Sequence, residues 1–168
     1  MMKNLIKLKK ATMKDLSISW IKWLNDKEVN KFSKKKNKIH TYQSQKKYLK
    51  ETLADNSKLL FMLIYQKKKV GTLLISKISK TNKHCEISYL LGEKKLWNKG
   101  LGTKFINSII RYILKKMKFN KIYAGVRSDN SSSQKILKNN NFKLEAKLKS
   151  HFFVNKKYLD YYIFSFRK

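Results

Sequence analysis

The spacing of apolar residues changes along the chain, and each change predicts a different kind of element. Near the start, Ile6 and Leu8 alternate with lysines, which is typical of a strand with one buried face. Apolar residues then recur at helical spacing in two segments, separated by a lysine-rich stretch over 33–40 that predicts a mobile loop. Between residues 59 and 91 they run together or alternate, with polar turns between, which predicts three consecutive strands in an antiparallel meander.

The predicted elements of this front half have ordinary lengths and recognisable caps. They are strands over 6–9, 59–65, 70–78 and 86–91, a helix over 16–25 capped by Thr12 or Asp15, a helical turn over 28–32, and a helix that Thr41 caps and that ends near 55–56.

The second half begins with the strongest helical stripe in the chain. Apolar residues repeat at helical spacing from Leu101 to Met117, which predicts a helix over 101–118. The remaining expected elements are a strand over 122–126, a helix that Asn130 caps and that ends near 139–141, and strands over 143–153 and 158–166. Strand, helix and strand in this order imply a right-handed crossover and a parallel pair. We therefore expect one α+β domain over 1–168, with a mixed α/β sheet in which a meander precedes a parallel β-α-β crossover and a C-terminal hairpin.

A glycine-rich junction connects the third meander strand to the strong helix. Gly100 and Gly102 lie at the start of that helix, where backbone N–H groups have no partner within the helix. Such a junction at the carboxyl end of a strand favours an anionic ligand, most often a phosphate. A plain turn followed by a helix would show the same pattern.

Composition narrows the class of protein. A hydrophobic content of 42% over 168 residues is enough for a packed core. No apolar run approaches the roughly 20 residues of a membrane span, and the first residues lack the apolar centre of a signal peptide. The single cysteine, Cys85, excludes an internal disulfide framework. We expect a cytoplasmic protein with no membrane partner.

The net charge of +31 suggests nucleic-acid binding, but its distribution argues against that role. The charge is almost all lysine and is spread along the whole chain, as AT-rich coding bias would produce, whereas specific nucleic-acid readers favour arginine. We therefore do not expect nucleic acid as the partner. Such a field still attracts small anionic ligands.

The order of elements and three groups of motifs resemble the GNAT superfamily of N-acetyltransferases over nearly the whole chain. The motifs are Ile87-Ser88-Tyr89-Leu90-Leu91-Gly92 with Trp97-Asn98-Lys99-Gly100-Leu101-Gly102-Thr103, then Asn130-Ser131-Ser132-Ser133 with Asn141-Phe142, and Leu144-Glu145-Ala146-Lys147-Leu148 ahead of Lys157-Tyr158-Leu159-Asp160. The combination looks most like the branch of ribosomal-protein N-terminal acetyltransferases and bacterial amino-sugar acetyltransferases.

The resemblance implies that acetyl-CoA is the acetyl donor. Its pyrophosphate would lie on backbone N–H groups of the glycine junction, and its pantetheine arm beside the preceding strand. The cofactor-binding residues implied in this way are Leu90, Leu91, Trp97, Asn98, Lys99, Gly100, Leu101, Gly102, Thr103 and Asn130.

The chain departs from the superfamily pattern at the positions of the usual acid and base. Where many relatives have a tyrosine acid this chain has Leu137, and where many have a glutamate base it has Gly125. In the ribosomal-protein enzymes a serine and a glutamate match Ser133 and Glu145, so the resemblance implies a thiolate donor and an amine base there. Glu86, at the start of its strand, is a further candidate base.

Each of these candidates also has a structural interpretation. Ser133 can assist a helix cap, Glu145 can form a surface salt bridge, and Glu86 can lie at an exposed strand end. Candidate acceptor-binding residues are His40, Tyr158 and Asp160, and Tyr161 on the same hairpin could line the acceptor pocket too. No spacing of histidine and cysteine predicts a metal site.

These observations lead to one functional hypothesis with two alternatives. We expect acetyl transfer from acetyl-CoA to a primary amine by direct attack, with a nucleotide-linked amino sugar of bacterial surface-glycan synthesis as the favoured acceptor. The first alternative acceptor is the N-terminal amine of a ribosomal protein. The second alternative is a non-enzymatic RNA- or ribosome-binding module on the same fold. A homodimer is compatible with the sequence.

Overall fold

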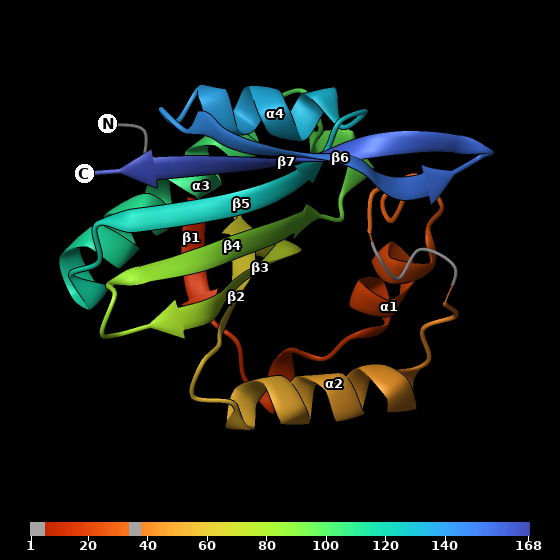
Figure 1. Cartoon of the computed structure of the whole chain (residues 1–168). Helices are drawn as coiled ribbons and strands as arrows, with labels where there is room; N and C mark the ends of the chain where they lie inside the picture. The colour runs from red at the N-terminus through yellow and green to blue at the C-terminus, as the bar shows by residue number, and fades with distance from the viewer. Residues whose placement is uncertain (1–5, 34–37) are drawn as a thin grey trace.

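The computed structural model describes residues 6–33 and 38–168, which form a mixed sheet of seven strands with helices on both faces (Figure 1). Along the sheet the order is β1-β2-β3-β4-β5-β7-β6. The strands are β1 (Ile6–Lys10), β2 (Leu59–Tyr65), β3 (Lys68–Ser79), β4 (His84–Leu91), β5 (Lys121–Arg127), β6 (Lys143–Val154) and β7 (Lys157–Arg167). The helices are α1 (Ile18–Asn25), α2 (Tyr42–Ala54), α3 (Leu101–Tyr112) and α4 (Ser131–Lys138).

The expected fold class is confirmed. Strands β1 to β4 pair antiparallel in sequence order, and β4 pairs parallel with β5 across α3. The C-terminal hairpin turns back so that β7, rather than β6, lies beside β5. Strand β6 is consequently the edge of the sheet, and most of its residues are exposed.

Two apolar clusters hold the helices on the sheet. The larger lies under α3 and α4 and includes Phe105, Ile109, Leu137 and Phe164, each at most 1% exposed. The smaller lies under α1 and α2 on the opposite face and includes Trp20, Leu49 and Met62. Because side chains alternate along a strand, even-numbered residues of β4 face the smaller cluster and odd-numbered residues face the larger one.

Most element bounds agree with those predicted, and the differences have local causes. The predicted helix over 16–25 begins later, because the Ser17 hydroxyl accepts the Trp20 N–H and caps α1. Thr12 and Asp15, the predicted caps, instead bound the 3-10 turn Met13–Asp15. The predicted helix over 101–118 changes to a π-helical stretch at Ile113–Met117, and Lys118 ends it in the left-handed region. The predicted loop over 33–40 includes residues 34–37, which lie outside the described part of the chain.

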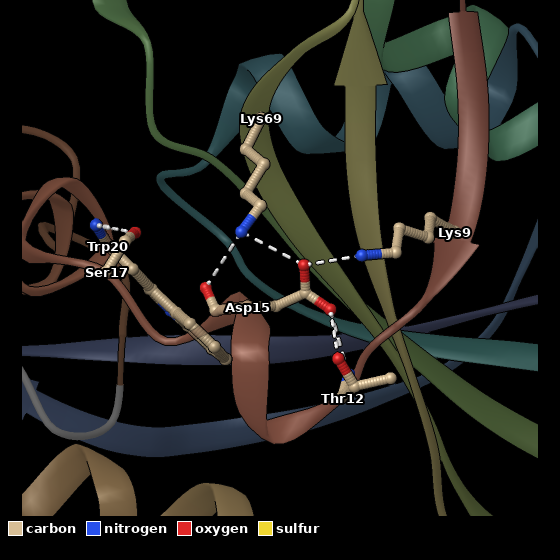
Figure 2. A network of polar contacts seen from close by, with 6 residues as sticks. All are labelled: Lys9, Thr12, Asp15, Ser17, Trp20 and Lys69. Atoms are coloured by element: carbon tan, nitrogen blue, oxygen red, sulfur yellow. Dashed lines mark hydrogen bonds and ion pairs between the residues drawn. The ribbon is translucent and has the colours of Figure 1, made fainter.

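A buried carboxylate in the 3-10 turn before α1 ties this turn to the first and third strands (Figure 2). Asp15 is 1% exposed, and its Oδ1 lies 2.8 Å from Lys9 Nζ and 3.0 Å from Lys69 Nζ. Its Oδ2 accepts the backbone N–H and the hydroxyl of Thr12. Burial alone would raise the pKa of this carboxyl, but the hydrogen bonds from Lys9, Lys69 and Thr12 together hold the pKa well below its ordinary value. An ionised aspartate therefore holds the turn before α1 against β1 and β3.

Candidate active site

The feature that organises the candidate site is the divergence of β4 and β5. Both strands are fully described, and they pair only from His84–Lys121 to Glu86–Tyr123. Beyond Glu86, β4 continues to Leu91 while paired with β3, and β5 continues to Arg127 while paired with β7. Each strand therefore presents an inner backbone edge to a wedge-shaped gap that opens toward the carboxyl ends of the strands. An extended ligand could hydrogen-bond to such edges as an added strand does.

The mouth of this gap is formed by the glycine junction ahead of α3. Asn98 and Gly100 have φ values of 59° and 71°, and a Cβ at Gly100 would meet no atom within 4 Å. The first helical bond is donated by Lys104 N–H to the Gly100 carbonyl, so the N–H groups before Lys104 have no partner within the helix. Exposed N–H groups at the positive end of a helix dipole are suited to a phosphate.

Two of the expected cofactor contacts are changed by backbone geometry. A Cβ at Gly71 on β3 would lie 2.1 Å from the Leu90 carbonyl oxygen, so Leu90 presents its carbonyl to β3 rather than to the gap. The Leu91 carbonyl accepts the indole N–H of Trp97 at 2.9 Å. By strand alternation, the backbone groups of Tyr89 and Leu91 face the gap. The Leu90 carbonyl is therefore turned away from the gap, and Trp97 anchors the end of β4.

On the α3 and α4 side of the gap, a pair of hydroxyl groups connects β4 to α4. Tyr89 Oη lies 2.8 Å from Ser133 Oγ, and the Tyr89 side chain packs against the larger apolar cluster. Asn130 caps α4 as predicted, because its Oδ1 accepts the Ser133 N–H at 3.1 Å. The Ser133 hydroxyl is therefore directed to Tyr89 rather than used in the cap. Burial raises the pKa of Tyr89 to about 12, although the Ser133 contact opposes the shift.

The opposite face of the gap, toward α1 and α2, carries charged and phenolic groups. Glu86 lies at the last paired position of β4, its side chain is 18% exposed, and its Oε2 is 2.8 Å from Lys77 Nζ. This ion pair raises the pKa of Lys77, chiefly through the hydrogen bond to Glu86. The Lys77 ammonium also lies 6.0 Å from the ring centre of Tyr123. Glu86 is thus a half-buried carboxylate at the vertex of the gap rather than a free strand end.

Gly125 and Tyr161 form a matched pair on this same face. A Cβ at Gly125 would lie 1.7 Å from the Tyr161 hydroxyl oxygen, so this hydroxyl occupies the space that a side chain at 125 would need. The His151 ring stacks on the Tyr161 ring at 5.2 Å, and Phe152 packs against its edge at 5.3 Å. Burial raises the pKa of the Tyr161 phenol, and the nearby Glu86 carboxylate adds to the effect. Tyr161 therefore brings a protonated hydroxyl from β7 to the side of β5 where the gap opens.

Glu145 is separated from these groups, and its expected role as a base is not supported. It lies on the edge strand β6, with β7 between it and β5, and its Oε1 is 2.6 Å from Lys121 Nζ and 3.4 Å from Arg167 Nη2. The hydrogen bond from Lys121, with another from Ser165, lowers the pKa of Glu145 to about 2. A carboxylate held so firmly in its ionised form is a poor proton acceptor near neutral pH. The salt-bridge interpretation is the one that the structure favours.

The expected acceptor-binding residues lie in two places. His40 precedes α2, and Asn25 fixes its backbone by accepting the His40 N–H and donating to its carbonyl. Next to it, a cavity of about 490 Å³ is lined by Leu24, Asn25, Asp26, Lys27, Asn30, Lys38 and Ile39. Tyr158 is 69% exposed near the tip of the β6–β7 hairpin, and Asp160 accepts the Ser150 N–H across that hairpin. These three residues therefore do not form one cluster with Glu86.

Sequence reasoning gave Tyr89 no role of its own, and it named Tyr161 only as a hairpin residue that could line the acceptor pocket. The sequence showed that Tyr89 lies on the strand that leads to the glycine junction. It did not show the contact with Ser133 on α4, which lies 44 residues away. The signal for Tyr161 was the glycine at position 125, since an unexpected glycine in a strand indicates close approach by another group. Within the described ranges, no group of three or more histidine, cysteine, aspartate or glutamate side chains could hold a metal ion. No helix in the described part of the chain is long and apolar enough to cross a membrane.

Known proteins resemble this chain in both sequence and fold. A family model described as "Acetyltransferase (GNAT) domain" matches residues 8–163. The acetyltransferase PseH of Campylobacter jejuni is 31% identical over 140 residues, which cover 82% of this chain and 85% of that protein. In fold, the chain is similar to a spermidine N-acetyltransferase of Vibrio cholerae solved with CoA and spermine, with a TM-score of 0.87, 18% identity, and 98% and 96% of the two chains covered. It is equally similar to the ribosomal L7/L12 acetyltransferase RimL solved with coenzyme A, with a TM-score of 0.87, 15% identity, and coverage of 98% and 95%.

The two kinds of likeness carry different weight. At 18% and 15% identity the solved structures establish the fold alone, whereas the family model spans most of the chain and PseH exceeds 30% identity. The protein therefore belongs to the GNAT acetyltransferase family, and is an enzyme that takes its acetyl group from acetyl-CoA.

Proposed function

We propose that the enzyme binds acetyl-CoA in the gap between β4 and β5 and transfers the acetyl group directly to a primary amine. The observation that carries this proposal is the divergence of the two strands beyond Glu86 and Tyr123, with the glycine junction at its mouth. A gap bounded by two backbone edges suits the amides of a pantetheine arm. The N–H groups over 98–103, at the start of α3, suit the pyrophosphate.

The residues at the mouth of the gap fit such a ligand. Gly100 leaves open space where a Cβ would project, and Lys99 and Asn98 are exposed beside it. Gly102 has a second task, because a Cβ there would lie 2.7 Å from Ile136 Cδ1 on α4. We assign the donor contacts to the junction over 97–103, to Leu91, and to the amide of Asn130 that caps α4.

Proton transfer from the acceptor amine is assigned to Glu86. An ammonium must lose a proton before its nitrogen can attack a thioester carbonyl, and a carboxylate beside the reacting carbon can accept that proton directly or through water. Glu86 lies at the vertex of the gap on the face that α3 and α4 leave uncovered, with the hydroxyl of Tyr161 on the same face. Ser133, on the other face, is assigned to the sulfur of the leaving group.

A covalent intermediate on the enzyme has no support among the groups at the gap. Cys85 is the one cysteine of the chain and is fully buried in the larger cluster. Burial raises the pKa of its thiol to about 12, so it holds its proton and does not act as a nucleophile. Direct attack by the amine is therefore the simpler path.

The acceptor that we propose is an amino sugar linked to a nucleotide. The net charge of +31 favours a substrate that carries a diphosphate and disfavours a polycation such as a polyamine, although a spermidine acetyltransferase shares the fold. The N-terminal amine of a ribosomal protein is the second candidate, because a RimL enzyme shares the fold. That second candidate rested on Ser133 and Glu145 together, and the ion pair with Lys121 argues against Glu145 as a base. We place the reaction in the cytoplasm, where acetyl-CoA is available.

The test is calorimetric titration of the purified protein with acetyl-CoA at low and high salt. We expect stoichiometric binding that persists at high salt, because the N–H contacts are local whereas lysine attraction is screened. Binding that disappears with salt would contradict the assigned site and favour non-specific anion binding. Titration with RNA separates the non-enzymatic alternative, which requires selective RNA affinity and no acetyl-CoA binding.

A pair of variants locates the donor site on α3. Thr103→Glu adds a negative charge in the first turn, where it suits the helix dipole but repels a phosphate, so we expect at least a 30-fold loss of acetyl-CoA affinity with normal stability. Asn107→Glu makes the same change one turn further along the helix and should bind acetyl-CoA nearly as the wild type does. Equal affinities in the two variants would refute the placement of the pyrophosphate.

A further inference from the structure

The two hydroxyl groups on the α3 and α4 side of the gap have more hydrogen-bonding capacity than their mutual contact uses. Tyr89 and Ser133 together carry two hydroxyl hydrogens, and either oxygen can be the donor in the 2.8 Å bond between them. One hydrogen is spent in that bond. The other can be donated to a third atom.

The location of the pair determines what that third atom can be. Tyr89 lies three residues beyond Glu86, the last residue of β4 that pairs with β5, so its backbone lines the gap. Ser133 lies in the first turn of α4, directly after β5. The pair therefore connects β4, one edge of the gap, to α4, the helix that follows the other edge, on the face opposite Glu86. A ligand reaching the vertex of the gap passes between a carboxylate on one face and two hydroxyls on the other.

The protonation state of the pair suits a donor and not a base. Burial among apolar side chains raises the pKa of Tyr89 to about 12, so its hydroxyl stays protonated throughout the neutral range. The alternative position for a donor on α4, Leu137, is 0% exposed and packs in the larger cluster. Tyr89 thus supplies from β4 a phenol that α4 does not provide.

We propose that the Tyr89–Ser133 pair donates the hydrogen bond that stabilises the departing thiolate, with Tyr89 as a catalytic residue beside Ser133. This inference rests on the proposed function, because it takes the acetyl donor to lie in the β4–β5 gap. As the amine nitrogen forms its bond to the carbonyl carbon, the carbon–sulfur bond breaks and its electron pair goes to sulfur. The pair keeps its protons and donates to the sulfur. Glu86 first releases to solvent the proton that it took from the ammonium. It then accepts the proton that the amine nitrogen loses as the amide forms, and the thiolate takes a proton from solvent on release.

The decisive measurement needs no acceptor substrate. Free coenzyme A is bound to the enzyme, and the thiol pKa of the bound form is read from the ultraviolet absorbance of the thiolate as pH is raised. A hydrogen bond to the thiolate lowers that pKa, so Tyr89→Phe should raise it by about one unit, a tenfold change in the thiol–thiolate equilibrium. We expect Ser133→Ala to raise it by a smaller amount, because the Tyr89 hydroxyl remains.

Turnover with a surrogate amine gives a second reading. Tyr89→Phe should lower kcat by about 10- to 100-fold and leave the KM for acetyl-CoA nearly unchanged, because the bond forms as charge develops on sulfur. The matched control is Tyr112→Phe, which removes the hydroxyl of another half-buried tyrosine packed on the same cluster and should change neither quantity. Thermal unfolding checks that both variants are folded, and Ser133→Ala serves if Tyr89→Phe is not.

The possible results separate this inference from the proposal on which it rests. If coenzyme A does not bind to the wild type, both are overturned. If it binds and the thiol pKa is the same in wild type, Tyr89→Phe and Ser133→Ala, the donor site stands and the role of the hydroxyl pair is refuted. A raised thiol pKa in Tyr89→Phe alone, with normal stability, supports Tyr89 as the principal donor.

Discussion

The two faces of the sheet meet at the β4–β5 gap, but they are built in different ways. Toward α3 and α4 the packing is apolar, from Phe105 to Phe164, and its polar content at the gap is two neutral hydroxyls. Toward α1 and α2 the sheet carries ionised groups, with Asp15 buried near one edge and Glu86 at the centre. A neutral face suits a leaving group that develops charge, and a charged face suits an amine that must lose a proton.

The difference also separates the residues that fold the protein from those assigned to chemistry. On the α3 and α4 side, the larger apolar cluster serves folding and chemistry together. It supports the sheet, and by burying Tyr89 it raises the pKa of that residue. On the other side Asp15 holds the turn before α1, while Glu86 and Tyr161 lie away from it on the central strands and the hairpin. Variants on this second side should therefore divide into two kinds, one affecting stability and one affecting turnover.

The largest expected effect is on stability, at Asp15. Asp15→Asn leaves Lys9 and Lys69 facing a neutral group, and we expect the free energy of unfolding to fall by about 2–3 kcal/mol. This loss is smaller than is usual when one partner of a buried ion pair is removed, because both lysines are partly exposed. Folding lowers the pKa of the Asp15 carboxyl. The stability that the ionised Asp15 contributes is therefore present above the unfolded pKa of about 3.9 and is lost as pH falls toward the folded-state pKa. The stability gap between wild type and variant should thus narrow below pH 4. Urea unfolding at several pH values measures it.

The control for this prediction is Asp55→Asn, since Asp55 pairs with Lys58 at the surface. Its effect on unfolding should be much smaller and should fade in salt. Similar losses in the two variants would show that the turn before α1 does not depend on the Asp15 network.

The next largest effect is on turnover, at Glu86. Glu86→Gln keeps the shape of the side chain but removes the proton acceptor, so we expect kcat to fall by about 100-fold while acetyl-CoA affinity is retained. Glu145→Gln is the matched control, because its ion pairs with Lys121 and Arg167 lie at the edge of the sheet. Steady-state kinetics of both variants make the comparison. If Glu145→Gln were the inactive variant, the general base would be Glu145 and not Glu86.

The smallest expected effect comes from Gly125. An alanine there requires the Tyr161 hydroxyl to move, and we expect a loss of about 1–2 kcal/mol in stability with a five- to tenfold fall in kcat. Adding Tyr161→Ala should recover part of the stability but not the turnover. If Gly125→Ala is as active as the wild type, the position of the Tyr161 hydroxyl has no part in the reaction.

The sequence predicted the fold well because the fold depends on local periodicity. The meander over 59–91, the α3 stripe and the Asn130 cap all follow from residues close together in the chain. The resemblance also implies where the donor would bind, since the glycine junction is a continuous segment. Glu86, Ser133 and Glu145 were all candidates from the sequence, but a choice among them depends on contacts between distant elements.

Glu145 and Tyr89 illustrate the limit. Glu145 matches a base in sequence, but an ion pair holds it at the sheet edge, and its partner Lys121, 24 residues away, could not be identified from the sequence. Tyr89 belongs to a motif that carries the resemblance, but it became a catalytic candidate only when β4 was placed beside α4. Spacing along one element reveals which face a residue occupies, but not which residue from another element meets it there.

The short parallel ladder between β4 and β5 also has a mechanical consequence. Three residue pairs join the half of the sheet made of β1 to β4 to the half made of β5, β7 and β6. Until a ligand fills the gap, those three pairs are the strand pairing that sets the tilt of one half of the sheet relative to the other. An acetyl donor that hydrogen-bonds to both strand edges would add contacts between the two halves of the sheet. These contacts would be lost when free coenzyme A leaves. Amide hydrogen exchange along β4 and β5 should then slow when the donor binds, so the rigidity of the enzyme would vary through each catalytic cycle.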